Sequence, residues 1–289
     1  MWQRIKNKIG YLVLAGLLAG AVFVWQADGT GQDEGKVKID FFDVGQGSAV
    51  LIDALNGNQV LIDGGPGDAI LNKLGEVMSY FDRKIELVIL THPDADHLSG
   101  LVEVLRRYEV GEILETGIAD SSSEYQAWKD LIGEKNIPMV FAQAGQIIKI
   151  ADGLEIKILY PFSKINGQDF SKNTNNTSIA GKIIYGKNSL LFTGDAEEAE
   201  ESSLLYSGLD LKAGILLVGH HGSKNSTGQE FLSAVAPQSA VIQVGAKNSY
   251  GHPTQEVLDR LKSIKVFRTD QNGDIDFLCD LTKYELAAN

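Results

Sequence analysis

The chain has 289 residues, of which 44% are hydrophobic and 22% are charged, a composition typical of a globular protein with a substantial core. Its net charge of −12 argues against a dedicated binder of duplex nucleic acid, which normally carries a basic face. The single cysteine, Cys279, excludes an internal disulfide framework and a cysteine-rich zinc site, and we expect it on a buried strand.

The first thirty residues form a unit of their own. Arg4, Lys6 and Lys8 precede an uncharged apolar stretch over residues 9–25. As a helix with a rise of 1.5 Å per residue, this stretch would be roughly 25 Å long, a short but sufficient membrane span. Because the positive flank stays in the cytoplasm, the rest of the chain would lie outside. We therefore predict a signal anchor over residues 1–27, and a single-pass protein of the cell membrane whose main domain is extracytoplasmic.

The alternative at this end of the chain is a cleaved signal peptide, which would make the protein secreted. Cleavage before Asp28 would put Trp25 three positions upstream of the cut, and so bulky a side chain is a poor cleavage signal. The polar, glycine-rich stretch over residues 28–35 is typical of a linker. Residues 36–289 then form the main domain.

The main domain begins with strands. Alternating polar and apolar residues predict a strand at 36–42, and the hairpin signal Asn56-Gly57-Asn58 joins strands at 49–52 and 59–62. Helical spacing of apolar residues predicts helices at 69–81 and 98–107, and serines that can cap a helix open a third at 121–135. Similar patterns predict strands at 87–90, 112–114, 139–141, 147–150, 154–159, 178–185, 189–192, 215–218, 240–244, 265–268 and 275–278, and helices at 196–205, 228–235 and 254–264.

Short strands with hairpin turns occur in both halves, and helices lie between them in the sequence. This mixture predicts an α/β class with two mixed sheets face to face and helices outside. Strand ends from both halves would then meet along one edge, and the polar motifs fall at such strand ends.

The densest group of ligand-type side chains follows the apolar run at 87–90. It holds His92, Asp94, Asp96 and His97 within six residues. An extended backbone sends alternate side chains to one side, so His92, Asp94 and Asp96 can converge, and His97 follows as the helix begins. Imidazole and carboxylate at this density indicate a divalent-metal pocket. The alternative is a solvated polar turn at a strand end.

Two further groups also follow apolar strands. Asp195 ends the segment Phe-Thr-Gly-Asp, where its carboxylate could bridge two metal ions or cap the following helix. His220 and His221 end a third strand, where one imidazole could bind metal while the other orients or contacts substrate. The alternative for this pair is an exposed position on a loop.

Other polar residues have supporting roles in this prediction. Ser223 and Lys224 could help to bind a phosphate. His252, as a lone histidine, is either a satisfied loop residue or a group that contacts or protonates a leaving group. Asp43 and Asp63 lie in glycine-flanked turns, where we expect them to stabilise the turn or to orient metal ligands.

These motifs, in this order, resemble the metallo-β-lactamase superfamily, and most closely the metallo-hydrolase domain of the ComEC competence proteins. The resemblance extends over residues 36–277, nearly the whole of the main domain. It is carried by eight stretches, at 41–47, 61–65, 91–100, 175–179, 191–195, 218–223, 250–253 and 268–270.

The resemblance implies a four-layer αββα sandwich with two divalent metal ions, Zn²⁺ or Mn²⁺, between its halves. By this resemblance His92 and Asp94 bind one metal ion, Asp96 and His97 bind the other, Asp195 bridges them, and His221 completes a shell. The segment 175–178 stands where most members supply another histidine, which leaves the occupancy of one metal position open.

The function that follows is a metal-dependent hydrolase using a metal-activated hydroxide, since a bound ion lowers the pKa of water from 15.7 toward about 7. We expect a membrane-tethered extracytoplasmic phosphodiesterase or nuclease of ComEC type, with Asp96, His220 and His252 in catalysis. Its partners would be the membrane, through the N-terminal helix, and a nucleic acid or other phosphodiester, with no obligate protein partner. The alternatives are a hydrolase of a lactone, a β-lactam or a cell-wall phosphodiester, and a non-catalytic binding protein with a degenerate metal site.

Overall fold

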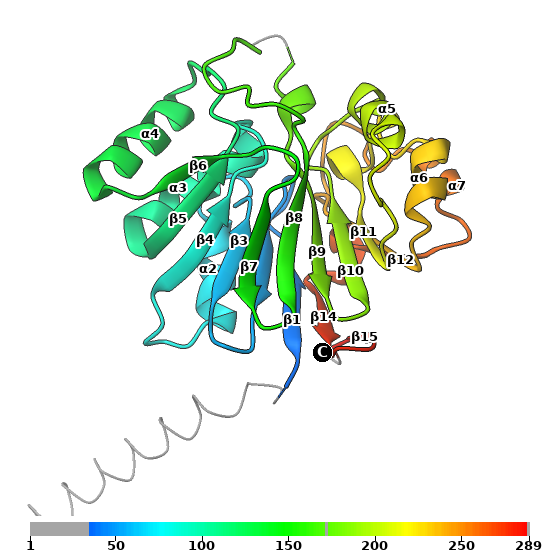
Figure 1. Cartoon of the computed structure of the whole chain (residues 1–289), viewed down its shortest axis with the longest axis horizontal. Helices are drawn as coiled ribbons and strands as arrows, with labels where there is room; N and C mark the ends of the chain where they lie inside the picture. Colours follow the sequence, from blue (N-terminus) through cyan, green and yellow to red (C-terminus); the bar gives the residue numbers. More distant parts are fainter. Residues whose placement is uncertain (1–34, 171–172, 288–289) are drawn as a thin grey trace, which may run out of the picture.

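The computed structural model describes residues 35–170 and 173–287 (Figure 1). The predicted anchor over residues 1–27 lies outside the described residues, as does the predicted linker except for the exposed Gly35. Within the described ranges, no helix has both the length and the apolar character needed to cross a bilayer.

The first sheet has eight strands. In spatial order they are β15 (Tyr284–Leu286), β14 (Ile275–Cys279), β1 (Val37–Phe41), β2 (Val50–Asp53), β3 (Gln59–Ile62), β4 (Lys84–Ile89), β5 (Glu109–Glu115) and β6 (Met139–Phe141). Pairing is antiparallel from β15 to β3 and parallel from β3 to β6.

The second sheet has seven strands. In spatial order they are β13 (Lys265–Arg268), β12 (Ser239–Ile242), β11 (Ile215–Leu217), β10 (Asn188–Phe192), β9 (Ala180–Tyr185), β8 (Leu154–Tyr160) and β7 (Ile147–Ala151). It too is parallel on one side, from β13 to β10, and antiparallel on the other. Because the carboxyl ends of parallel strands share one edge, β10 and β11 deliver their following loops to the same place.

Helices cover the outer face of each sheet (Figure 1). Those on the first sheet are α2 (Ala69–Val77), α3 (Ala95–Arg107) and α4 (Ser123–Lys135); those on the second are α5 (Glu198–Tyr206), α6 (Gln229–Val235) and α7 (Gln255–Arg260). Three short helices complete the described elements: η1 (Asn175–Thr177), η2 (Gly219–Gly222) and α8 (Thr269–Asn272).

Three apolar clusters hold the layers together. The central one lies between the two sheets and includes Ile52 and Phe192. A second joins the first sheet to its helices through residues such as Trp128, and a third joins Leu216 to Phe231 on the other side. The chain therefore has four layers, helix, sheet, sheet and helix, as the sequence predicts.

Most predicted elements are confirmed within a few residues at their ends. Ser122 caps α4 by accepting a hydrogen bond from the backbone N–H of Tyr125, and Cys279 is buried on β14. The helix predicted to end at Phe81 ends at Val77 instead, and the apolar Phe81 beyond it is exposed. Helix α8 and strand β15 are additional elements that the apolar pattern does not predict.

Candidate metal centre

The predicted ligand groups follow the carboxyl ends of three strands. Strand β4 leads to His92, β10 leads to Asp195, and β11 leads to His220 and His221. His92 and His97 are completely buried, while Asp195 and His221 are at most 4% exposed. The alternatives of a solvated polar turn and an exposed histidine pair therefore do not describe these side chains.

The first motif folds differently from its predicted geometry. Asp94 is the N-cap residue of α3, which begins at Ala95, so Asp96 and His97 lie in its first turn. The extended backbone therefore ends at Asp94. The prediction that Asp96 reaches the site from an extended strand is wrong, because Asp96 lies in a helical turn. Asp94 does not use its side chain as a cap; its carboxylate accepts a hydrogen bond from the Thr174 hydroxyl at 2.5 Å and lines the site.

Four side chains form one compact group of donors. The ligand atoms of Asp96, His97, Asp195 and His221 all lie within 4.8 Å of one another. His97 Nε2 lies 3.2 Å from Asp195 Oδ1, and His221 Nε2 lies 3.3 Å from Asp96 Oδ2. Two imidazoles and two carboxylates are a suitable donor set for a divalent ion such as Zn²⁺ or Mn²⁺.

A looser group lies around Asp195 Oδ2, which His221 Nε2 also approaches, at 3.6 Å. His92 Nε2 is 3.8 Å from Asp94 Oδ2 and 3.9 Å from Asp195 Oδ2. His220 Nε2 is 3.7 Å from the same Asp195 oxygen. Asp195 therefore faces both groups, as a bridging carboxylate would. It does not cap α5, whose N-cap residue is Glu197.

Hydrogen bonds leave three Nε2 atoms free to act as ligands. His221 Nδ1 is 2.8 Å from the carbonyl oxygen of Gln243, so Nδ1 carries the proton. His97 Nδ1 donates in the same way to Asp63 Oδ2 at 2.8 Å. The Nε2 atoms of His92, His97 and His221 are buried and have no hydrogen-bond partner. Unpartnered basic nitrogens facing carboxylates fit a bound cation, because burial without a partner is otherwise unfavourable.

Thr91 and Asp63 also orient the imidazole ring of His92. The Thr91 hydroxyl donates to Asp63 Oδ2 at 2.8 Å, so it can accept from His92 Nδ1, which lies 3.1 Å away. Asp63 therefore orients His97 directly and His92 through Thr91, which supports its predicted orienting role.

The electrostatics of the site favour a cation. Burial lowers the pKa of His97, but the carboxylates of Asp195 and Asp63 outweigh it and hold that pKa well above its ordinary value. Burial raises the pKa of Asp195, yet His97 and His221 outweigh this effect and hold it well below its usual range. The negative charge here is strong enough to hold a proton on a buried imidazole, and a divalent ion would satisfy it in the proton's place.

A cavity of about 130 Å³ opens onto these side chains. Its lining residues are Gln46, Asp94, Asp96, Asn175, Asp195, His220, His221, Tyr250 and His252. His252 thus reaches the site, as predicted, and its ring centroid is 5.6 Å from that of His220. Asn175 also lines the cavity, and it belongs to the segment 175–178 that the resemblance places where most family members supply another histidine.

Besides Asp63, three predicted supporting residues are not among those that line the cavity. Asp43 braces its own turn by accepting a hydrogen bond from the Gly45 N–H. Ser223 is buried and its hydroxyl accepts from the Asn225 N–H, while Lys224 is exposed. Their roles in orienting ligands and binding substrate stay predictions without support from this geometry.

Sequence reasoning missed two residues that orient the histidines of the site. The Thr91 hydroxyl orients His92, and Gln243 holds His221 through its carbonyl oxygen. Gln243 also ties the sheets together, because its side-chain amide donates to the carbonyl oxygens of Phe42 and Ala49. Thr91 directly precedes His92, which is a usable signal, whereas Gln243 is distant in sequence and carries none.

Comparisons with known sequences agree with this geometry. The profile of the metallo-beta-lactamase superfamily matches residues 42–245. ComE operon protein 3 of Bacillus subtilis (strain 168) is 31% identical over 259 residues, which are 83% of this chain and 33% of that protein. Recombination protein 2 of Haemophilus influenzae is 33% identical over 233 residues, 79% of this chain and 27% of that protein. The chain thus spans about a third or less of the length of these relatives.

Solved structures show the same fold. The metallo-beta-lactamase fold protein YhfI from Bacillus subtilis superposes with a TM-score of 0.55 at 13% identity, over 83% of this chain and 99% of that chain. The two-sheet α/β architecture and the compact donor group support a hydrolase that uses divalent metal. With the profile covering more than half of its length, the chain belongs to the metallo-beta-lactamase superfamily, and proteins of the ComEC competence type are among its relatives.

Proposed function

We propose that this chain is a metal-dependent phosphodiesterase that acts on nucleic acid while tethered outside the cell membrane. The observation that carries the proposal is the convergence of three unpartnered, buried histidine Nε2 atoms on the carboxylate of Asp195. The names of two relatives, Competence protein ComA of Neisseria gonorrhoeae and Recombination protein 2 of Haemophilus influenzae, favour nucleic acid over other phosphodiesters.

The chain's own residues have distinct tasks in this proposal. His92 and Asp94 would hold one ion, while Asp96, His97 and His221 would hold a second, with Asp195 facing both. Bound divalent ions would supply an activated water and neutralise phosphate charge. Three carboxylates among the donors make the set hard enough for Mn²⁺ as well as Zn²⁺.

His220 and His252 lie at the open side of the donor group. His252 is half-buried, lines the cavity, and has a buried Nδ1 without a hydrogen-bond partner. A bound phosphodiester would therefore meet His252 beside the carboxylates, where the ring can donate to a phosphate or leaving-group oxygen. His220 would either contact the same phosphate or add to the ligands near His92.

The position of the first described residues suits a tether. Gly35 and the start of β1 at Val37 lie at one end of the strand, whose other end leads to Gln46 in the cavity wall. Five residues of strand rise about 17 Å. Because Gln46 in the cavity wall follows the far end of β1, a tether attached before Gly35 would join the domain at the end of β1 away from the cavity. Protease treatment of intact cells tests this topology, since a protected domain would contradict it.

The activity is tested with the purified full chain, in detergent, on single-stranded DNA, double-stranded DNA and bis-p-nitrophenyl phosphate. Each substrate is incubated with Mn²⁺, with Zn²⁺ or with a chelator. We expect metal-dependent cleavage that falls by at least about 100-fold in Asp96→Ala, because this change removes a candidate metal ligand. Asp152→Ala, in the exposed turn between β7 and β8, is the matched control and should cleave as the unaltered chain does.

Two results would contradict the proposal. Unchanged cleavage by folded Asp96→Ala protein would show that the activity does not come from this site. Hydrolysis of a lactone or β-lactam, with no phosphodiester cleavage by metal-loaded protein, would assign the site to another hydrolase class.

A further inference from the structure

An exposed aromatic side chain stands at the rim of the cavity. Tyr250, in the loop between β12 and α7, lines the cavity although its side chain is 70% exposed. Its ring lies at 25° to that of His252, with the centroids 5.9 Å apart. His252 in turn meets His220 edge-on at 5.6 Å. A row of three rings therefore leads from solvent to the candidate metal centre.

The loop that carries Tyr250 is braced from within. Asn248 Oδ1 accepts hydrogen bonds from the backbone N–H groups of Tyr250 and His252, each at 3.1 Å. The side-chain amide of Asn248 donates to the carbonyl oxygens of His252 and Gly245, at 2.7 and 2.9 Å. Beyond the loop, the Thr254 N–H donates to Gly222 at 3.0 Å, beside the histidine pair. The backbone that carries Tyr250 is thus held in place before a ligand arrives, which lowers the entropy lost on binding.

We propose that Tyr250 is a stacking platform for an unpaired nucleobase next to the phosphate at the metal centre. The rest of the cavity wall offers carboxylates, imidazoles and amides, so Tyr250 is its one broad apolar face. Aromatic rings bind bases of any sequence through their π-faces. Bases within a duplex are already stacked on their neighbours, so the platform selects single strands and frayed ends. This inference rests on the proposed phosphodiesterase function.

The charge of the chain agrees with this choice. A net charge of −12 gives little general attraction for the backbone of a long duplex. Binding at this site would then depend on local contacts, with the metal centre taking one phosphate and Tyr250 taking the adjacent base. A short contact of this kind needs no extended basic groove.

The test compares the full chain with Tyr250→Ala and Tyr250→Phe, loaded with Mn²⁺. The substrates are a single-stranded oligonucleotide and one of equal length whose central residues are abasic. We expect Tyr250→Ala to lower kcat/KM on the intact strand by about 5- to 150-fold, the equivalent of about 1–3 kcal/mol of stacking. The preference for the intact over the abasic strand should shrink by the same factor, while Tyr250→Phe retains most of it. Tyr80→Ala removes a comparably exposed tyrosine that is not part of the cavity wall, and should change neither rate.

The possible outcomes distinguish failure of the Tyr250 platform from failure of the proposed phosphodiesterase function. An unchanged base preference in Tyr250→Ala, with cleavage intact, would overturn the platform and leave the phosphodiesterase standing. Equal losses on intact and abasic strands would also overturn it, since the ring would then act on the cavity itself. No cleavage of either strand by metal-loaded, unaltered protein would remove the proposed function and the platform together.

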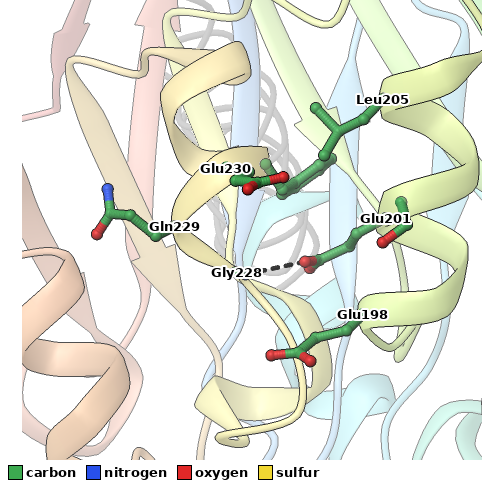
Figure 2. Close-up of a pocket in the computed structure, with 8 residues that line it drawn as sticks. Glu198, Glu201, Leu205, Gly228, Gln229 and Glu230 are labelled. Carbon is green, nitrogen blue, oxygen red and sulfur yellow. Dashed lines mark hydrogen bonds between the residues drawn. The ribbon is translucent and has the colours of Figure 1, made fainter.

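A second inference comes from a separate observation, a buried acid between α5 and α6. Glu201 is only 2% exposed and belongs to the wall of a cavity of about 240 Å³ that also contains Glu198 and Glu230 (Figure 2). Its carboxylate accepts hydrogen bonds from the backbone N–H groups of Thr227 and Gly228, at 2.5 and 2.8 Å. Burial raises its pKa to about 7.

The loop that Glu201 binds also makes hydrogen bonds to Gly219, the residue before the histidine pair. The Gly219 N–H donates to the Thr227 hydroxyl at 3.2 Å, and the Gly219 carbonyl oxygen accepts from the Ser226 hydroxyl at 2.8 Å. Arg260 also stabilises this loop, since its guanidinium donates to the carbonyl oxygens of Ser226 and Thr227 at 3.1 and 3.3 Å. Both backbone polar groups of Gly219 therefore depend on residues that Glu201 and Arg260 fix.

The histidine pair needs such support. His220 and His221 have φ values of 48° and 53°, and Thr227 has a φ of 55°. Left-handed backbone at three non-glycine residues persists only where the surroundings impose it. We infer that Glu201 is a positioning residue that keeps His221 Nε2 directed at the metal centre, acting through Thr227 and Gly219.

The test measures metal affinity of the full chain by titration with Mn²⁺ and Zn²⁺. Glu201→Gln should weaken binding by about 10- to 100-fold, the range seen for groups that orient metal ligands, because one amide N–H would face a backbone N–H. Thr227→Val keeps the side-chain shape but removes the acceptor for Gly219, and should weaken binding in the same direction. Glu198→Gln, in the wall of the same cavity, is the matched control and should leave affinity unchanged.

A double-mutant cycle distinguishes positioning from general stabilisation. In a His221→Ala background, Glu201→Gln should cause little further loss of affinity, because its effect passes through that histidine. If Glu201→Gln and Thr227→Val lower only the unfolding midpoint and leave metal affinity intact, the positioning role is excluded.

Discussion

Replacing Asp195 by alanine is expected to remove metal-dependent hydrolysis, with kcat lower by at least about 1000-fold, or about 4 kcal/mol of transition-state stabilisation. The reason is that the Asp195 carboxylate lies among the candidate histidine ligands. One carboxylate oxygen lies 3.2 Å from His97 Nε2, and the other lies 3.6 to 3.9 Å from the Nε2 atoms of three more histidines. Without this carboxylate, four imidazoles would lose the anionic group that their Nε2 atoms approach.

The measurement pairs kcat with bound metal, determined by elemental analysis of the purified full chain. Asp195→Asn is a useful companion, because the amide keeps the shape of the side chain but loses its charge. Asp130→Ala, on the exposed face of α4, is the control and should retain both metal and rate. A folded Asp195→Ala protein that binds metal and turns over at the original rate would exclude Asp195 from the site.

Asp63→Asn is expected to weaken metal binding by about 10- to 100-fold and to lower the free energy of unfolding by about 1–3 kcal/mol. Asp63 is 2% exposed, and its two oxygens accept from the Thr91 N–H, the Thr91 hydroxyl and His97 Nδ1, each at 2.8 Å. An asparagine amide offers one acceptor oxygen in place of two. One of these buried donors would then face an N–H group, and both His92 and His97 would lose part of their orientation.

Asp43→Asn supplies the control for this prediction. Asp43 also lies in a glycine-flanked turn, but its carboxylate accepts a hydrogen bond from the backbone N–H of Gly45, whereas the Asp63 carboxylate accepts from Thr91 and His97. Metal titration together with urea unfolding should therefore show a loss for Asp63→Asn and little change in affinity for Asp43→Asn. Equal behaviour of the two variants would mean that Asp63 does not orient the histidines.

The contrast between these two aspartates shows where sequence reasoning ends. Both follow a strand and both have glycine neighbours, so their local patterns predict the same role. The structure separates them through strand pairing. Strand β3 is parallel to β4, and the Asp63 N–H donates to Ile89 at the end of β4, which places Asp63 beside Thr91. Strand β1 pairs with β14, and the Asp43 N–H donates to Asp274 instead.

Tyr250 and Glu201 make the same point. Tyr250 is an ordinary exposed tyrosine in sequence, and only the return of its loop to the histidine pair brings it to the cavity rim. Glu201 is one of several acidic residues in α5, and its burial against Thr227 is a consequence of how α5 and α6 pack. Neither position carries a local signal.

By itself, the sequence determined the class of the fold, the position of most strands and helices, and the group of residues that make the candidate metal centre. It could do so because apolar periodicity is local, and because His92, Asp94, Asp96 and His97 are close in the chain and need no tertiary contact to be noticed. Only the tertiary structure decided that α3 begins at Ala95, so that Asp96 lies in a helical turn. It also decided which nitrogen of each buried histidine is free and which polar residues orient them, because those properties depend on hydrogen bonds between strands far apart in sequence.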